Sequence, residues 1–205
     1  MPANTPRGYP YPLPTEPVAE GAQAIRNLAE AIDAKGFVKI DEKILAAAAA
    51  TIDFSAIPQT FTHLEVRALL RSDQNAAYTD TGFRLNGDTG ANYNTEALQA
   101  VATTPTAYNR INDTSGHTGQ CSGASAPASN FSSTVIRLYG YRNTALFKAA
   151  DVLTTMRFAS ASPAVTVFTI ASFWSSLAAV NRLTLILPPS WNFVIGSQAA
   201  LYGIP

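Results

Sequence analysis

Histidine and cysteine, the residue types that most often bind zinc, are scarce in this chain. There are two histidines, His63 and His117, and one cysteine, Cys121. His117 and Cys121 are four residues apart, which supplies only part of the tetrahedral ligand set of a structural zinc site. We therefore expect no metal and no other cofactor. Cys121 lies in a stretch rich in Gly and Ser, and we interpret it as a free thiol at the surface.

Acidic residues form a second group with chemical potential, because two carboxylates about 5–10 Å apart can cleave a glycosidic bond. Linear spacing singles out no such pair, and the chain lacks a G-x-S-x-G motif, a Walker loop and a dinucleotide-binding fingerprint. The acidic candidates are Asp53, Glu65, Asp80, Asp88, Glu96 and Asp113. We expect the protein not to be an enzyme, with a glycan-cleaving activity as the alternative.

The turn-rich stretch at residues 86–94, N-G-D-T-G-A-N-Y-N, offers several oxygen atoms and resembles a calcium loop. An EF-hand loop requires a bidentate Glu at its twelfth position, and counting from Asn86 this position holds Ala97. Asn and Gly tolerate the positive φ that tight turns require. We therefore interpret the stretch as a turn between two strands.

Glycan binding is the chemistry that aromatic residues with amide neighbours would provide. Tyr and Trp combine an apolar ring with a polar group, and nearby amides or carboxylates can bond sugar hydroxyls. Aromatic residues occur near expected loops and strand ends at Tyr78, Phe83, Tyr93, Tyr108, Trp174 and Trp191. Packing in the core or in an interface is the role that we favour for most of these rings. The candidate glycan contacts are Tyr78, Asn92, Tyr93, Tyr108, Asn112 and Asp113.

The elements that position these residues are expected to be β-strands. Leu64, Val66, Ala68 and Leu70 alternate with mostly polar residues, which indicates a strand with one face on a core and the other in water. Leu69 interrupts the polar face. About eight to ten short strands recur at regular spacing, punctuated by Gly and Pro. The pattern predicts a mainly β fold, an antiparallel, jelly-roll-like β-sandwich over residues 37–205.

Individual segments of this domain carry further predictions. They are a short strand within a connector at 37–40, a first main strand at 47–54, a helical turn or a strand at 95–102, a long polar loop at 112–130, and strands at 133–141, 153–159, 164–173, 180–187, 192–195 and 199–204. The segments 164–173 and 180–187 are apolar on both faces. Such strands are covered on both sides or lie at a subunit interface.

Residues 1–17 are rich in proline, with Pro at positions 2, 6, 10, 12, 14 and 17. Proline fixes φ and removes a backbone donor, so this segment is expected to be an extended arm without a core of its own. Tyr9, Tyr11 and Leu13 are apolar groups that can dock the arm onto another protein. A frayed terminus is the alternative.

Residues 18–36 are predicted to form a short helix, which begins after Pro17 and ends at Gly36. Val18, Ile25, Leu28 and Ile32 are spaced by seven, three and four residues, as in a short coiled-coil seam. A seam of barely two heptads needs attached domains to hold it together. We expect this helix to be an oligomer seam, with a helix lying on its own domain as the alternative.

Composition excludes several partners. Fourteen basic and fourteen acidic residues give a formal net charge of zero, so we expect no nucleic acid and no anionic membrane as a partner. No apolar run approaches the ~18 residues of a membrane span, and the first residues do not read as a signal peptide. Only 14% of residues are charged, against roughly 25% in typical chains. A surface poor in charge suits subunit contacts, and a surface rich in Ser, Thr and Asn is the alternative explanation.

The sequence resembles virion proteins of phages, particularly minor tail proteins of phages that infect actinobacteria. The resemblance covers most of the chain and is most specific at T-P-R-G-Y-P-Y-P-L-P-T-E-P-V-A-E-G-A-Q-A-I-R-N-L-A-E-A-I-D, at F-R-L-N-G-D-T-G-A-N-Y and at F-V-I-G-S-Q-A-A-L-Y-G-I. The segment T-H-L-E-V-R-A-L-L-R-S is similar as well, whereas 112–130 matches nothing in that family.

The resemblance implies a structural protein of the virion that is made in the host cytoplasm. It would be a minor tail, tail-fibre or spike component, commonly a homotrimer, in which the arm and helix attach to other virion proteins. The sandwich would then face outward and contact a glycan of the host surface. A head fibre or decoration protein on the capsid is the alternative, and the sequence does not separate the two locations.

Overall fold

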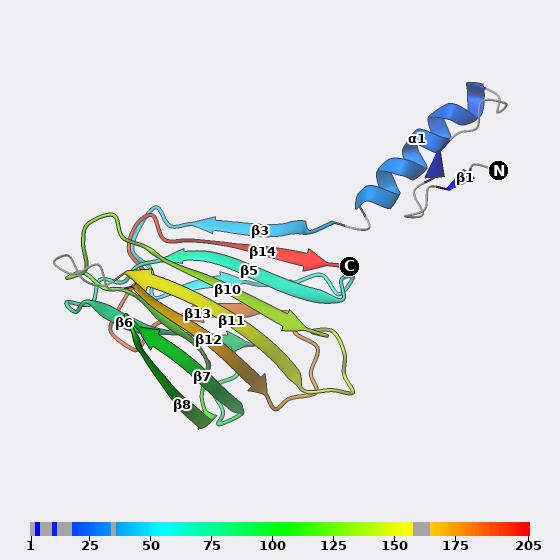
Figure 1. Ribbon diagram of the computed structural model, residues 1–205. Helices are drawn as coiled ribbons and strands as arrows, with labels where there is room; N and C mark the ends of the chain where they lie inside the picture. The colour runs from blue at the N-terminus through cyan, green and yellow to red at the C-terminus, as the bar shows by residue number, and fades with distance from the viewer. Residues whose placement is uncertain (1–2, 5–9, 12–17, 34–35, 158–164) are drawn as a thin grey trace.

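A helix and two stacked sheets make up the computed structural model, which describes residues 3–4, 10–11, 18–33, 36–157 and 165–205 (Figure 1). The elements are β1 (Ala3–Asn4), β2 (Pro10–Tyr11), α1 (Val18–Asp33), β3 (Val38–Ile44), β4 (Thr51–Phe54), β5 (His63–Leu70), β6 (Tyr78–Leu85), β7 (Tyr93–Val101), β8 (Thr104–Asp113), β9 (Gly116–Ser122), β10 (Ser132–Tyr139), β11 (Lys148–Arg157), β12 (Val165–Trp174), β13 (Leu183–Ile186) and β14 (Gln198–Ile204).

Two antiparallel sheets pack face to face and enclose the core. The larger sheet has eight strands in the order β3-β14-β5-β10-β11-β12-β7-β8, and the smaller has four in the order β4-β13-β6-β9. Buried apolar residues of both sheets belong to one cluster, among them Leu64 and Ile136 from the larger sheet and Phe83 and Leu185 from the smaller. The mainly β, antiparallel sandwich expected from the sequence is therefore confirmed.

Period-two alternation places side chains on the inner and outer faces of the larger sheet. In β5 the predicted inner residues Leu64, Val66, Ala68 and Leu70 are all buried, whereas Leu69 on the opposite face is exposed. In β12 buried and exposed residues alternate without interruption from Val165 to Trp174. The outer side chains of β12 are nevertheless largely apolar, as the sequence indicated.

Tyr93, at the start of β7, connects the two sheets. Its side chain is fully buried and its hydroxyl lies 2.9 Å from the backbone nitrogen of Leu85 in β6, which donates the hydrogen bond. Its ring meets Phe83 edge-to-face and stacks on Trp174 of β12. The indole nitrogen of Trp174 donates to Asp88, which anchors the turn between β6 and β7. Tyr93 is therefore a core residue rather than a surface contact.

The long polar loop predicted at 112–130 is wrong over its first half. β8 extends to Asp113, and β9 pairs with β6, so Cys121 lies in a strand and is fully buried rather than a surface thiol. Gly119 in β9 has a φ of 89°, and a Cβ there would lie 3.0 Å from the ring of Phe168. Small residues in this strand let it approach β12 closely, which is why its composition resembles that of a loop.

The second half of that segment is held by one side chain. The guanidinium group of Arg71 donates to the carbonyl oxygens of Ala124, Ala126, Pro127 and Asn130 at distances of 2.7–3.2 Å. These bonds satisfy backbone carbonyl groups that form no hydrogen bonds with a strand. The connection between β9 and β10 therefore has a defined course without regular secondary structure.

Three other segments differ from their predictions or resolve an open choice. β3 is a strand of seven residues at the edge of the larger sheet, longer than the short strand predicted within a connector. Residues 95–102 fall almost entirely in β7 and are not helical. The strand predicted at 192–195 is wrong, because only Phe193 pairs there, in isolated bridges to Ala49 and Ser72.

At the N-terminus α1 begins at Val18 and ends at Asp33, and it stands apart from the sandwich (Figure 1). β1 and β2 form a two-residue ladder within the proline-rich arm. Tyr9 and Leu13 lie outside the described residues, and only the backbone of Tyr11 is described.

The side chains of the predicted seam are described in part. Those of Val18 and Ile32 are not among the described ones, whereas Leu28 is half-buried and Ile25 is 66% exposed. Because Ile25 is a large apolar residue, its exposure leaves the middle of the stripe open to another chain.

Replacing Tyr93 with Phe should lower the free energy of unfolding by about 1–3 kcal/mol, because the buried Leu85 N–H loses its acceptor. Denaturant unfolding measures this change. Tyr139→Phe is the matched control, since its hydroxyl bonds Asp151 at the surface, and it should change stability by about 0.5 kcal/mol or less. Equal effects of the two substitutions would contradict the role assigned to Tyr93.

Candidate functional site

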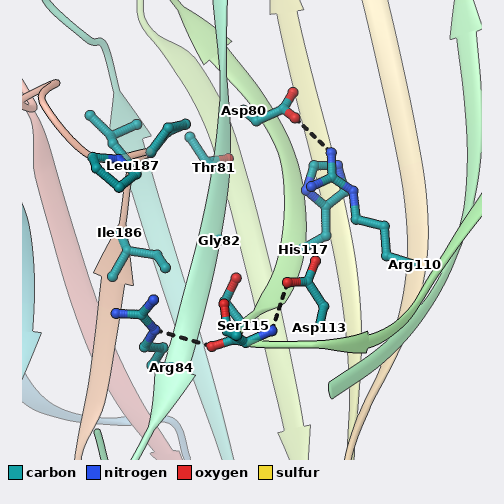
Figure 2. Close-up of a pocket in the computed structure, with 13 residues that line it drawn as sticks. Asp80, Thr81, Gly82, Arg84, Arg110, Asp113, Ser115, His117, Ile186 and Leu187 are labelled. Carbon is teal, nitrogen blue, oxygen red and sulfur yellow. Dashed lines mark hydrogen bonds and ion pairs between the residues drawn. The ribbon is translucent and has the colours of Figure 1, made fainter. Parts of the chain in front are cut away.

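A shallow cleft of about 270 Å³ opens on the outer side of the smaller sheet, where its β6–β9 edge meets β8 (Figure 2). It is lined by residues from β6, β8, β9 and the chain that leaves β13. They are Asp80, Thr81, Gly82, Arg84, Arg110, Asp113, Thr114, Ser115, His117, Ile186, Leu187, Pro188 and Pro189.

One wall of the cleft carries paired charges. Arg110 reaches from β8 to Asp80 of β6 with 2.6 Å between nitrogen and oxygen, and Gln120 donates to the other oxygen of Asp80. Arg84 donates through Nε to the carbonyl of Thr114. The other two guanidinium nitrogens of Arg84 can also donate hydrogen bonds, as can the guanidinium nitrogens of Arg110 that do not contact Asp80. They lie near the carboxylates of Asp80 and Asp113.

His117 lies behind this wall and is almost fully buried. Its Nε2 is 2.7 Å from the hydroxyl of Tyr108. Burial, and secondarily the positive charge of Arg110, lowers the pKa of His117 to about 4, while burial raises the pKa of Tyr108 to about 12. Both side chains are therefore neutral near pH 7, and this hydrogen bond ties β8 to β9.

The opposite wall is largely apolar, and Gly82 separates the two walls. In Figure 2, Ile186 and Leu187 lie on one side of the β6 strand, with Arg84 below them, and Asp80 and Arg110 lie on the other side. Pro188 and Pro189 also line the cleft. A Cβ at Gly82 would lie 2.8 Å from the carbonyl oxygen of Gly116, so the missing side chain both permits this strand pairing and leaves the hollow. A charged wall facing an apolar wall suits a ring with hydroxyls on its edge and C–H groups on its face.

The structure brings together some of the predicted glycan contacts. Asp113 lines the cleft, and Tyr108 supports it from behind. Asn112, with a φ of 54°, lies next to Asp113 at the end of β8. Tyr78 is exposed, and because it is two residues from Asp80 it lies on the same face of β6.

Asn92 and Tyr93 lie elsewhere. The Asn92 amide donates to Asp88 within the β6–β7 turn, and Tyr93 is in the core. Sequence reasoning did not assign Asp80, Arg84, Arg110 or His117 to a binding site, because these residues meet through the pairing of strands far apart in the chain.

Among the described residues, five of the six carboxylates considered for glycan cleavage, all but Glu96, accept a hydrogen bond or form an ion pair. Burial alone would raise the pKa of Asp53 and of Glu65, but hydrogen bonds from neighbouring side chains outweigh it and lower both pKa values. A hydrogen bond from Trp174 lowers the pKa of Asp88. A general acid for glycoside hydrolysis needs a raised pKa, so these three side chains do not suit that role.

Within the described ranges, no three or more His, Cys, Asp or Glu residues are grouped so that they could hold a metal ion. Nor does any helix in the described part of the chain have the length and apolar character needed to cross a membrane. The fold and the cleft define a β-sandwich protein with a small polar surface site. Comparisons with protein-family models, with curated proteins and with solved structures find no match.

The shifted pKa of His117 predicts a pH dependence of stability. The folded-state pKa of about 4 lies below the ordinary histidine pKa of about 6.5. The contribution of neutral His117 to stability is therefore complete above pH 6.5 and is lost as the pH falls towards 4. The full loss amounts to about 3 kcal/mol. Urea unfolding between pH 7 and pH 4 should show this decrease, and His117→Gln should reduce it.

The other histidine provides the control for this experiment. His63 accepts a hydrogen bond from the backbone of Gly140, remote from the cleft, so His63→Gln should keep the decrease attributed to His117. If His117→Gln retained the same decrease as the unaltered chain, the assignment to His117 would be wrong.

Proposed function

We propose that this protein is a structural component of a phage particle, a minor tail, tail-fibre or spike protein, that attaches through its N-terminal region and presents the sandwich outward. The position of α1 carries the proposal. The helix packs beside β2 rather than on a sheet of the sandwich (Figure 1). Ile25, on its apolar stripe, is exposed. An apolar helix stripe that its own domain leaves uncovered is available to other chains.

Two observations from the sequence support this proposal. The arm and helix carry one of the three specific parts of the resemblance to phage tail proteins. The low fraction of charged residues, 14%, suits a protein with extensive subunit contacts. In a homotrimer three copies of α1 would bring Val18, Ile25, Leu28 and Ile32 to a common seam, held together by the three sandwiches.

Adhesion to a host-surface glycan is the proposed role of the cleft. Asp80 and Asp113 offer acceptors, and Arg84 and Arg110 offer donors. The charges that line the cleft are therefore balanced and suit the hydroxyl groups of a neutral ligand better than a charged ligand. The apolar wall from Ile186 to Pro189 would cover the C–H face of a sugar ring. We therefore assign the cleft to neutral hexose units.

A capsid location is the second candidate, because a head fibre or decoration protein would have the same architecture. The exposed helix and the cleft are equally compatible with a position on the tail and a position on the capsid. Tail and head are therefore distinguished by direct labelling of particles.

Gold-labelled antibodies against this protein should decorate the phage tail or its tip in electron micrographs. Label over the head would favour the capsid alternative. A chain lacking residues 1–36 should not join particles, because the attachment region is missing. Co-purification of the truncated chain with virions, or no label on intact or disrupted particles, would contradict the proposal.

Replacing Asp80 with Asn should weaken binding of neutral oligosaccharides at least about tenfold, since one charge-assisted acceptor of the sugar and the partner of Arg110 are lost. Binding is measured on an array of host cell-wall sugars and then by calorimetry. Asp53→Asn is the matched control: Asp53 is ion-paired with Arg182 at 2.7 Å but does not line the cleft. Equal binding by both variants would exclude the cleft as the glycan site.

A further inference from the structure

The outer face of the larger sheet carries an apolar band that no described part of the chain covers. It crosses five neighbouring strands, β10, β11, β12, β7 and β8, which lie side by side in Figure 1. Leu98 is 61% exposed and Leu153 is 50% exposed, high values for leucines in central strands. The apolar band comprises Val135, Leu153, Leu98, Ala107, Val167, Ala100 and Pro105.

Strand register makes the band continuous. Val135 pairs with Leu153, and Leu153 pairs with Thr169, which in turn pairs with Leu98 of β7. In the adjacent row Val167 pairs with Ala100. Only Thr and Ser interrupt these rows, so no charge lies within the band. Apolar residues on both faces of a strand are typical of strands that are covered on both sides.

The face is hollowed rather than flat. A depression of about 420 Å³ lies over β7, β8 and β12 and is lined by Leu98, Ala100, Pro105 and Val167 among others. A second, of about 410 Å³, lies over β10, β11 and β12 around Leu153. Apolar side chains of a partner can fill such depressions, which a flat, water-covered sheet would not offer.

Charges beside the band are separated along the sheet. At the β5–β10 end, Arg67 and Arg137 bracket the buried Glu65 through Nε–oxygen distances of 2.7 and 2.8 Å, leaving a net positive charge. Asp151 of β11 lies directly beside Arg137 as its cross-strand partner, and Glu96 lies further on, in β7. The sign of the charge therefore changes from positive to negative across the sheet, so the Arg67–Arg137 end of the face is complementary to the Glu96 end of the same face on a second copy.

We propose that the outer face of the larger sheet is an interface between copies of this chain, in which the β7–β8 end of one copy packs against the β5–β10 end of its neighbour. Because both copies use the same face, the contact is isologous and relates the two copies by a twofold axis. The inference stands on the sandwich alone and does not depend on a phage role.

The band is large enough for the apolar core of such an interface, but not for the whole of it. With strands about 4.8 Å apart and residues of one face about 6.8 Å apart along a strand, the band covers roughly 300–400 Å². A stable interface buries about 800 Å² on each partner, with an apolar core and a polar rim. The band would supply the core, and the flanking charged row would supply part of the rim.

The test separates the sheet face from the helix seam. In the full chain carrying Ile25→Asp, self-association measured by light scattering should persist, and adding Leu153→Asp should raise the dissociation constant at least about tenfold. Leu177→Asp is the matched control, because Leu177 is also 50% exposed but lies in the loop after β12. Leu153→Ser, with far-UV circular dichroism of every variant, guards against loss of folding.

The outcomes are distinct. Weaker association in the Leu153 variants, with the Leu177 control unchanged, supports the sheet face as the interface. Association that is unaffected by Leu153→Asp, or equally affected by Leu177→Asp, overturns the proposal. A monomeric mass for the chain with only Ile25→Asp, at the highest concentration that stays in solution, overturns it as well.

Discussion

Burial of the Tyr93 hydroxyl between the sheets is the constraint on which the rest of the sandwich depends. A phenol can be buried in an apolar core only if its oxygen has a partner, and the backbone of Leu85 supplies it. This requirement fixes β6 of the smaller sheet relative to β7 of the larger one. Stacking of Tyr93 on Trp174, and the bond from Trp174 to Asp88, extend the constraint to β12 and to the β6–β7 turn.

Once β6 and β7 are fixed, the cleft follows from strand pairing. β8 pairs with β7 and β9 pairs with β6, so the ends of two different sheets meet at one edge. Arg110 and Asp80 are thereby brought within 2.6 Å, although thirty residues separate them in the chain. The neutral pair of Tyr108 and His117 connects the same two strands without placing a charge in the interior. Asp80, Arg110 and Asp113 of the site thus lie on strands, whereas Thr114, Ser115 and residues 187–189 belong to connections.

Patterns of neighbouring residues in the sequence predicted the parts of the fold that depend on short-range interactions. Alternation in β5 identified the inner face correctly, since one buried face imposes a period of two. The same reasoning failed for β9. Its small Gly, Thr and Ser residues allow close approach to β12, and their composition is typical of a loop. Arg71 illustrates the same limit: its four carbonyl partners lie more than fifty residues away. The cleft could not be predicted either, since its charged wall is assembled from three strands by long-range pairing.

The cleft and the apolar band lie on opposite faces of the sandwich. Asp80 and Ile186 point outward from the smaller sheet, whereas Leu153 and Leu98 point outward from the larger one. Association through the band would therefore leave every cleft of an oligomer accessible. A shallow polar cleft binds a single sugar weakly, because hydroxyl groups exchange one set of hydrogen bonds in water for another. Several copies held at fixed spacing convert weak single contacts into strong attachment to a repeating surface glycan. Self-association and adhesion would thus be two aspects of one arrangement.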